Sequence, residues 1–504
     1  MADEKVTEYR APLYGRLPIF TSIDSLDRGN PEAVIAEVNE ALSIHIQNVI
    51  AMEYLYWYRR GITPIYGKKK DVRPEINNKI SENHVSEIVE FKNGYFLTQP
   101  AMYISRREDE KISEKVKDLN EYLYRSGKLQ ADNELVDWFH TVGKADLFVQ
   151  SFEDPDVPFE AYALDPRSAF VVKSLKPGNK PVFAVNVVVN GEKLTLDVWD
   201  KTSVFTLEGT VTGRLTTPTP DYLCTATNVV EVKDNPIGEI PIIEYQYNSV
   251  GQSCFEAAIP LLDLLNQITS DRMDGLDQFV QSLLVFYNCE LGEDEDGKPT
   301  TPQAVRAAGA LFLKSIGENK ADLKEISSQL DQTQTQVFVD YIYEQIQTIC
   351  GMPTSTRNDR STSDTGIAVE MRNGWSMCET MARNTEDLFK KSNRQFDLII
   401  TQLLKKKRVL DISLNDFELH FTRNEMHGVQ SKAQALQALL SSGLAPTLAL
   451  AKSGVSSDPG SDYEASKGWM RLRWGDPNEE GPAPQTEIVE EDNNNGDTDI
   501  GANG

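Results

Sequence analysis

Residues 253–286 read SCFEAAIPLLDLLNQITSDRMDGLDQFVQSLLVF, and this stretch decides the expected architecture. Apolar side chains recur along it at helical spacing with polar ones opposite, which predicts one long amphipathic helix. Its apolar side consists of Leu261, Leu265, Ile268, Leu276, Phe279 and Leu283. We expect the other side to face water. That polar side consists of Asp263, Gln267, Ser270, Asp274, Gln278 and Gln281.

Two more long helices are predicted downstream. The first covers about residues 326–350, and a polar loop, TSTRNDRSTSD (354–364), follows it. The second starts near residue 366 and ends in the basic run Lys405–Arg408, whose cations suit a helix C-terminus. At about 1.5 Å per residue it is a rod of roughly 60 Å, which needs neighbouring elements to complete its core.

The N-terminal half combines helices with strands. Helical spacing predicts helices over 31–60, over 77–94, where Asn93-Gly94 would end it, and over 110–150. Alternating apolar residues and turn signals then predict strands as far as residue 248. Near the C-terminus, LNDFELHFTRN predicts a short strand pair, and helices follow to Trp474. The expected fold class is α+β, mostly helical.

The charge balance limits the nucleic-acid interpretations. The 504 residues carry a net charge of −26, and residues 475–504 hold nine Asp and Glu without Lys or Arg. Tight, sequence-independent DNA binding needs clustered cations, so the composition argues against it but not against weak contact with DNA. The composition of the C-terminal tail predicts disorder.

Five cysteines are spread singly, which suggests neither a zinc site nor a disulfide framework and fits a reducing compartment. The N-terminus lacks the apolar region of a signal peptide, and no run of 18 apolar residues occurs. We therefore expect no membrane span and a cytosol-like site of synthesis.

The stretch GEDEDGKPT (292–300) has the glycine and lysine spacing of a phosphate-binding loop. Pro299 stands where such a loop needs a hydroxyl for Mg²⁺, and four carboxylates would repel phosphates. We interpret the stretch as an acidic surface turn.

Catalytic patterns are missing elsewhere. The five histidines lie in unrelated contexts, and no G-x-S-x-G elbow occurs, so we predict no enzyme, no catalytic residue, no metal and no cofactor. His45 is expected in a core or interface. The basic runs at 68–70 and 405–408 are expected on the solvated surface, and the aromatic stretch 54–58 in packing.

Four segments in this order resemble those of a known family. They are NNKISENHVSEIVEFKNGYFLTQP (77–100), NPIGEIPIIEYQYN (235–248), PLLDLLNQITSDRMDGLDQF (260–279) and STSDTGIAVEMR (361–372). Together they resemble portal proteins, the head–tail connectors of tailed double-stranded-DNA bacteriophages, in the branch of long-tailed phages of Gram-positive hosts. The resemblance covers residues 30–475, and it departs from the family pattern at Gln99, Asp364-Thr365 and Val369.

The resemblance implies a ring, usually of twelve copies, at one vertex of a virion capsid. The ring would be the channel for genome packaging and ejection, with weak, non-specific contact to double-stranded DNA. Its implied partners are the terminase large subunit, a head–tail adaptor, and major capsid and scaffold proteins. The ATPase would be the terminase rather than this chain, and assembly would take place in the host bacterial cytoplasm.

The resemblance also implies a division of the chain. The parts are an N-terminal arm (1–29), a wing (30–253), stem helix 1 (254–286), a clip (287–325), stem helix 2 (326–350), a tunnel loop (351–365), a long wing helix with strands (366–427), a crown (428–474) and a disordered acidic tail (475–504).

Three sets of site residues follow from that division. The tunnel-loop residues expected at DNA are Thr354, Arg357, Asn358, Arg360, Ser361 and Thr362. The channel-lining stem residues are Asp263, Gln267, Asp274, Gln278 and Gln281. The partner-binding clip residues are Glu293, Asp294, Glu295, Asp296 and Lys298.

Other interpretations stay open at this point. The loop 351–365 is also consistent with an ordinary connection between helices. The chain as a whole is consistent with another virion or tail-apparatus subunit and, less well, with a packaging enzyme. A polar side of residues 263–281 that packed inside the protein would contradict the channel interpretation.

Overall fold

The computed structural model describes residues 15–71, 73–107, 109–191, 193–212, 223–280, 283–287, 289–291, 313–315, 322–326, 332–353, 374–421, 429–456 and 459–474. The chain divides into two compact units, Met1–Met426 and His427–Gly504. Across these ranges, every helix is too short or too polar to span a bilayer. Helices and sheets are both extensive, which agrees with the predicted α+β class.

A six-stranded sheet forms one side of the first unit. Its strand order is β1 (Phe20–Thr21), β5 (Ala169–Ser174), β6 (Pro181–Asn190), β7 (Lys193–Asp200), β8 (Ser203–Thr212) and β9 (Leu223–Asp234). Strand β1 is parallel to β5, and the other neighbours are antiparallel. Buried residues alternate with less buried ones along β7, as expected for a sheet with one face in the core.

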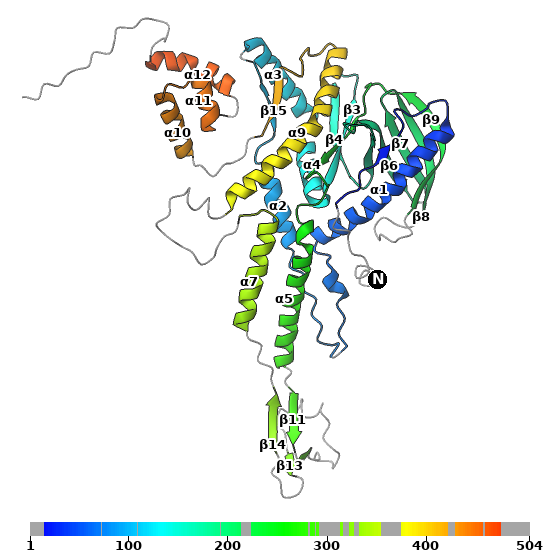
Figure 1. Ribbon diagram of the computed structural model, residues 1–504, viewed down its shortest axis with the longest axis vertical. Coiled ribbons are helices and arrows are strands. Elements are labelled where there is room, and N and C mark those ends of the chain that lie inside the picture. Colours follow the sequence, from blue (N-terminus) through cyan, green and yellow to red (C-terminus); the bar gives the residue numbers. More distant parts are fainter. Residues whose placement is uncertain are drawn as a thin grey trace, which may run out of the picture. The chain divides into compact units, whose positions relative to one another are not determined.

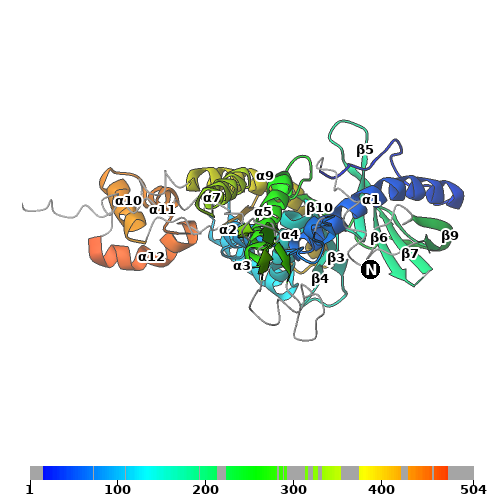
Figure 2. The same cartoon turned by 90° about the horizontal axis from the view of Figure 1, so that it is seen from below.

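Helix α1 (Pro31–Arg59) lies along this sheet (Figures 1 and 2). The Asn30 side chain caps its first turn and Pro31 starts it, both typical of a helix N-terminus. Its apolar stripe is buried in the core that the sheet shares. His45 on that stripe stacks on Phe170 at 4.3 Å, and burial lowers its pKa to about 3. The predicted core position of His45 is confirmed.

A three-stranded sheet supports the second core of this unit. Its order is β10 (Ile242–Gln246), β3 (Lys144–Ser151) and β4 (Phe159–Leu164). Helices α3 (Glu110–Arg125), α4 (Lys128–Val142) and α9 (Trp375–Lys406) contribute to the same core. The last turn of α9 holds Lys405 and Lys406, as the basic run predicted, whereas its predicted start at 366 lies outside the described residues.

The predicted helix over 110–150 is wrong beyond Val142. Gly143 takes a left-handed conformation, with φ of 94°, and β3 starts at the next residue. A β-carbon at Gly143 would come within 2.0 Å of the Gly251 carbonyl oxygen. Glycine is therefore required where the chain turns from helix to strand.

The predicted helix over 77–94 is wrong at both ends. Helix α2 covers His84–Phe96, because the Asn83 side chain caps the Ser86 N–H, and the helix continues through Asn93-Gly94. The strand pair predicted near residue 417 is also wrong as a local pair. Strand β15 (Phe417–His420) instead pairs with β2 (Met102–Ser105), far away in sequence.

Helices α5 (Ile259–Val280) and α7 (Gln332–Ile349) lie side by side (Figure 1). A short 3-10 turn, Glu256–Ala258, precedes α5. Strand β11 (Leu283–Tyr287) follows α5 and pairs with β14 (Asp322–Ile326), while β12 (Cys289–Leu291) pairs with β13 (Leu313–Ser315). Both predicted helices are therefore too long. Strand β11 starts at Leu283, where the first helix was expected to continue to residue 286, and β14 still includes Ile326, where the second helix was expected to start.

Three asparagines on helices bind extended backbone in the same way. Asn39 on α1 accepts a hydrogen bond from the Ala226 N–H at 2.8 Å and donates one to the Ala226 carbonyl at 3.0 Å. Asn48 makes this pair of bonds with Leu17, and Asn120 makes it with Tyr103. In each case one side-chain amide takes the place of a neighbouring strand.

A buried ionic cluster lies where the two sheets meet. Glu244 on β10 accepts a hydrogen bond from Lys173 on β5 at 2.7 Å and lies 3.6 Å from the Lys144 amine. Asp146, paired with Glu244 across the strands, is fully buried, and neither of its oxygens has a hydrogen-bond partner. Burial raises the pKa of Asp146 to about 8, with Glu244 adding to the rise, so its carboxyl is protonated at neutral pH.

The second unit consists of helices in the part that the structure describes. These are α10 (Val429–Ser441), α11 (Pro446–Ser453) and α12 (Pro459–Trp474), and each contacts the next in sequence. The helices predicted up to Trp474 are thus present.

Candidate functional site: the α5–α7 hairpin and its strap

Helix α5 changes surroundings along its length. Its first half lies in the main core, where Ile259, Leu262 and Leu265 are buried. Its second half contacts α7 and the segment 62–83, which includes a 3-10 turn, Pro64–Gly67. We call the segment 62–83 the strap (Figure 1).

The strap is hydrogen-bonded to α5 through a regular series of backbone amides. The Glu82 N–H donates to Asn266 Oδ1 at 2.8 Å, the Ile80 N–H donates to Ser270 Oγ at 2.9 Å, and the Asn78 N–H donates to Asp274 Oδ1 at 2.6 Å. Every second residue of the strap therefore meets every fourth residue of α5. We call these three bonds the ladder.

Asp274 is the most heavily bonded residue of the ladder. Its side chain is 2% exposed, and it accepts from Lys68 at 2.8 Å and from the Asn78 side chain at 2.9 Å. Lys70 forms a further ion pair with it at 2.5 Å. Burial alone would raise the pKa of Asp274, but the bonds from Lys68, Lys70 and Asn78 outweigh burial and hold the pKa well below its usual range.

A second polar cluster joins α2 to the hairpin. His84 lies 3.0 Å from Glu82 and 3.2 Å from Glu87, and its ring packs at a tilt against that of Tyr343 of α7. The Tyr343 hydroxyl donates to Glu87, while Thr269 of α5 donates to Glu82. The bond to Glu82 raises the pKa of His84, so its charged form is favoured.

An exposed row lies on the strapped part of α5. Leu264, Gln267 and Asp271 are exposed, and their spacing of three and four residues places them on one face. Asp271 is half exposed although it forms an ion pair with Lys68 at 2.7 Å. This face carries the polar side chains that are in contact with water in a single copy.

Large apolar side chains are exposed on both helices of the hairpin. Met273 and Leu276 on α5 are 40% and 49% exposed. On α7, Val337 is 67% exposed, and Phe338 and Tyr341 are about half exposed. A soluble single copy would leave these neighbouring side chains in water, which is typical of a surface that another protein covers.

The sequence comparison gives the family. Residues 40–463 match the family described as phage portal protein, SPP1 Gp6-like. The chain belongs to this portal family. As a member of this structural family, it has a portal or connector role. No curated protein matches the chain.

Solved structures that are similar to this portal-family chain include three from a gene transfer agent (GTA). The neck of an empty GTA particle, computed with C6 symmetry, has 13% identity, a TM-score of 0.40, and coverage of 74% of this chain and 90% of that chain. The neck of a native particle, computed with C12 symmetry, has 14% identity, a TM-score of 0.39, and coverage of 74% of this chain and 89% of that chain. The virion of the native particle has 13% identity, a TM-score of 0.40, and coverage of 74% of this chain and 89% of that chain. At these TM-scores the assignment rests on the family match alone.

The expected water-facing side of α5 is only partly correct. Asp274 and Ser270 are buried under the strap, so their expected exposure is wrong. Asp263 is partly buried and accepts from the Tyr58 hydroxyl at 2.8 Å. Gln267 is exposed, whereas the side chain of Gln278 and all of Gln281 lie outside the described residues. Helical spacing correctly gathers these residues on one side of α5 but cannot reveal what covers that side.

The other two predicted sets of portal residues cannot be placed. The tunnel-loop residues Thr354, Arg357, Asn358, Arg360, Ser361 and Thr362 lie outside the described residues. The same holds for the clip residues Glu293, Asp294, Glu295, Asp296 and Lys298. Both sets stay predictions.

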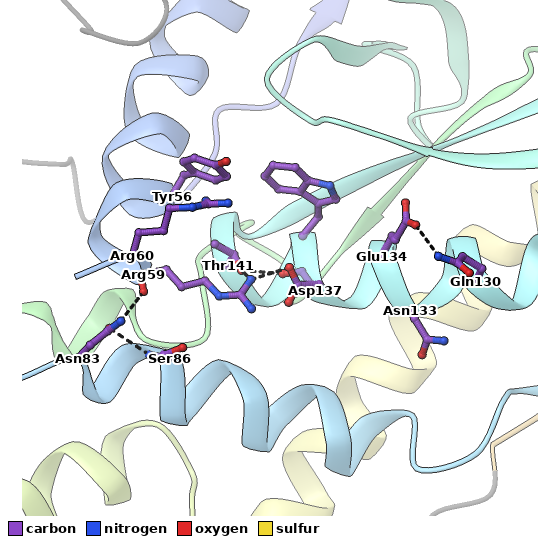
Figure 3. A pocket seen from close by; sticks show the side chains of 11 residues that line it. Tyr56, Arg59, Arg60, Asn83, Ser86, Gln130, Asn133, Glu134, Asp137 and Thr141 are labelled. Atoms are coloured by element: carbon purple, nitrogen blue, oxygen red, sulfur yellow. Dashed lines mark hydrogen bonds and ion pairs between the residues drawn. The ribbon is translucent and has the colours of Figure 1, made fainter. Parts of the chain in front are cut away.

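A polar groove of about 830 Å³ lies between the end of α1, the start of α2 and α4. Figure 3 shows Arg60 along the ring of Tyr56, where its guanidinium carbon is 3.6 Å from the ring centre. Arg59 donates to Asp137 at 2.5 Å and to Thr141 at 2.7 Å. The charges of Arg59 and Asp137 are thus paired with each other. The groove is lined by residues of three helices of the portal-family fold.

Within the described residues, no group of three or more His, Cys, Asp or Glu is placed to hold a metal ion. Four cysteines there, Cys224, Cys254, Cys350 and Cys378, are unbridged and buried. Burial raises the pKa of Cys350 to about 12, which keeps this thiol protonated at neutral pH.

The strap is the part of the site that sequence analysis missed. Its lysines were expected on the solvated surface, yet Lys68 and Lys70 bind Asp274. One signal was available, because Asn266, Ser270 and Asp274 recur every four residues and all can accept hydrogen bonds. That spacing predicts a polar partner along the helix as well as it predicts contact with water.

Proposed function

We propose that copies of this chain close into a ring around a channel for double-stranded DNA, at one vertex of a phage-like capsid. Membership of the portal family supports the role. The observation that carries the ring is the exposed apolar surface on both helices of the hairpin. Burying it against a second copy would remove apolar area from water, which favours association.

The interface would join unlike surfaces. Met273 and Leu276 belong to α5, whereas Val337, Phe338 and Tyr341 belong to α7. Contact between α7 of one copy and α5 of the next is head-to-tail, and head-to-tail contacts produce closed rings when the rotation between copies closes. Twelve copies remain the number that the family suggests.

The channel surface would come from the exposed row that contains Gln267 and Asp271. Amide and carboxylate groups do not attract phosphates strongly, and a net charge of −26 adds mild repulsion. DNA would therefore pass without being held. Asp274 and Asp263 are excluded from this role because the strap and Tyr58 bind them.

The remaining parts of the proposal come from the family division. The wing would cover 30–253, the stem helices 254–286 and 326–350, the long wing helix with strands 366–427, and the crown 428–474. The clip, 287–325, would dock the terminase large subunit during packaging and an adaptor afterwards, with its carboxylates reading a basic patch. Arg357 and Arg360 in the tunnel loop would touch phosphates.

Electron microscopy of the purified full-length chain tests the ring. We expect rings with a central hole, and Phe338→Asp should shift them to single copies by placing a charge in an apolar interface. Asp340→Asn, on the exposed part of the same helix, is the control and should leave the rings intact. Single copies of the unchanged chain at every concentration would overturn the proposal.

Replacement of Arg357 and Arg360 by alanine tests the tunnel loop separately. We expect normal rings but altered genome packaging or retention, because two phosphate contacts are lost. The measurement is the length and yield of packaged DNA. Unchanged length and yield would remove these side chains from the proposal.

A further inference from the structure

The ladder between the strap and α5 depends on a match of two repeat lengths. Four helical residues advance about 6.0 Å along the axis, and two extended residues advance about 6.6 Å. Acceptors at every fourth position of α5 therefore meet amides at every second position of the strap. The three acceptors, Asn266, Ser270 and Asp274, lie on one face of α5 because of the same spacing.

This arrangement fixes the rotation of α5 as well as its position. Moving α5 by one residue would turn it by about 100° and shift it by about 1.5 Å. All three acceptors would then leave their amides at once. Apolar packing of Ile259, Leu262 and Leu265 holds the first half of α5, and the ladder holds the second half, which lies outside that core.

Both ends of the strap are held by the helices of the first unit. Asn83, at its C-terminal end, caps α2 and donates to the Arg59 carbonyl of α1 at 2.9 Å. At its N-terminal end, the Ile62 N–H donates to the Trp57 carbonyl of α1 at 3.0 Å, and Thr63 donates to Ser81 at 3.1 Å, which ties the two arms of the strap together. The strap therefore connects the rotation of α5 to α1 and α2.

We propose that the strap sets the rotation of α5, so that Gln267 and Asp271 are presented to DNA while Met273 and Leu276 are presented to the neighbouring copy. Asn266, Ser270 and Asp274 are positioning residues in this proposal, and none of them touches DNA. The proposal rests on the proposed channel function and adds to it by naming the device that selects the lining face. In a helix that lines a channel, the rotation decides which side chains meet the DNA.

Residue-resolved hydrogen exchange of the full-length chain tests the ladder without any need for a ring. The amide hydrogens of Asn78, Ile80 and Glu82 should exchange at least about tenfold more slowly than those of the alternate residues between them. Ser270→Ala should speed exchange at Ile80, and Asp274→Ala should do so at Asn78. Thr269→Ala is the matched control, because this hydroxyl binds the Glu82 side chain rather than a backbone amide. Uniform exchange along 77–82 would overturn the ladder.

Photo-crosslinking in DNA-filled particles tests the selected face. A benzophenone maleimide is attached to Gln267→Cys or to Met273→Cys in a Cys289→Ser background, and that background alone is the blank, since the other four cysteines of the chain are buried. We expect position 267 to crosslink to DNA and position 273 to crosslink to a second copy. When Asp274→Ala is combined with either cysteine variant, each position should crosslink both to DNA and to a second copy. Asp274→Asn should have a smaller effect, because its amide oxygen still accepts the Asn78 N–H.

The outcomes separate this proposal from the channel itself. If the two positions exchange their products, or if Asp274→Ala leaves them unmixed, the strap does not set the rotation although the channel exists. If neither position ever crosslinks to DNA or to a second copy, the channel function fails, whatever hydrogen exchange reveals about the ladder.

Discussion

Two buried aspartates in the first unit behave in opposite ways. Asp146, between the two sheets, has no hydrogen-bond partner, and its pKa is raised to about 8. Asp274, under the strap, accepts bonds from two lysines and from a backbone amide, and its pKa is well below the usual range. Both side chains are shielded from water, and the donors around Asp274, which the Asp146 oxygens lack, favour the charged form of Asp274.

The difference also separates two kinds of structure. Apolar packing stabilises the sheet interface around Asp146, and burying the Asp146 carboxyl without a hydrogen bond lowers the stability of the fold. The strap contact is held by polar bonds directed at Asp274, and losing the carboxylate would leave its donors unpaired. The same chemical change at the two positions should therefore have opposite effects on stability.

Asp146→Asn has the largest expected effect, a stabilisation. The folded chain keeps the Asp146 proton up to about pH 8, whereas the unfolded chain releases it near its ordinary pKa of about 3.9. Stability therefore falls as the pH rises through this window, by at most about 1.4 kcal/mol per pH unit. The variant should therefore gain stability over the unchanged chain as the pH rises, with the largest difference near pH 8 and almost none near pH 4.

Urea unfolding followed by tryptophan fluorescence from pH 4 to pH 9 measures this difference. Asp118→Asn, on the exposed side of α3, is the control and should change stability by less than about 0.5 kcal/mol. An Asp146→Asn variant that is less stable than the unchanged chain at pH 8 would show that the carboxyl has a partner.

Asp274→Asn should destabilise the strap by about 2 kcal/mol at pH 7, because it removes the charge that Lys68 and Lys70 bind. The pKa of Asp274 is lowered in the folded state, so its contribution is present above the ordinary pKa of about 3.9 and is lost as the pH falls through the folded value. The advantage of the unchanged chain should therefore persist from pH 7 to about pH 4.

Limited trypsin digestion measures this effect, since Lys68, Lys69, Lys70 and Lys79 place cleavage sites in the strap. Cleavage there should be about thirtyfold faster in the variant. Asp271→Asn, whose side chain is half exposed, should change the rate by less than about threefold. Equal rates in both variants would place Asp274 among ordinary surface charges.

Substitution of His84 has the smallest expected effect on stability. Unlike the two aspartates, His84 is partly exposed. It is a quarter exposed and lies against Glu82 and Glu87, which raise its pKa. Its contribution is fully present below the ordinary pKa of about 6.5 and is lost as the pH rises through the folded value. His84→Gln should remove about 0.5 kcal/mol at pH 6 and less above the folded pKa.

Thermal unfolding of the His84→Gln variant at pH 6 and pH 9 tests this pH dependence. A midpoint loss that is the same at both values would mean that packing against Tyr343, rather than charge, explains the role of His84.

Much of the fold was predictable because local patterns decide it. The stripe of α1, the strands from 159 to 246 and the helices up to Trp474 follow from periodicity and turn residues. Helix ends were less predictable, since Gly143 ends α4 against a carbonyl from residue 251. The partner of β15 was not predictable, because β2 lies about 300 residues earlier.

The candidate site was predictable as a helix but not as a surface. Spacing places Asp263, Gln267 and Asp274 on one side of α5, and their polarity alone does not reveal which of them is exposed. Contacts with Tyr58 and the strap separate them, because both partners come from about 200 residues earlier. Sequence patterns describe what a helix presents, whereas its burial depends on distant segments.

The amide of Asn39 has a consequence for assembly. Strand β9 is at the edge of the six-stranded sheet, and a free edge is a template onto which a strand of another molecule can add. Asn39 occupies both hydrogen-bonding groups of Ala226 on that edge. This side-chain amide blocks strand addition at Ala226, and the contacts between copies that we propose would run through helices and would not need this edge.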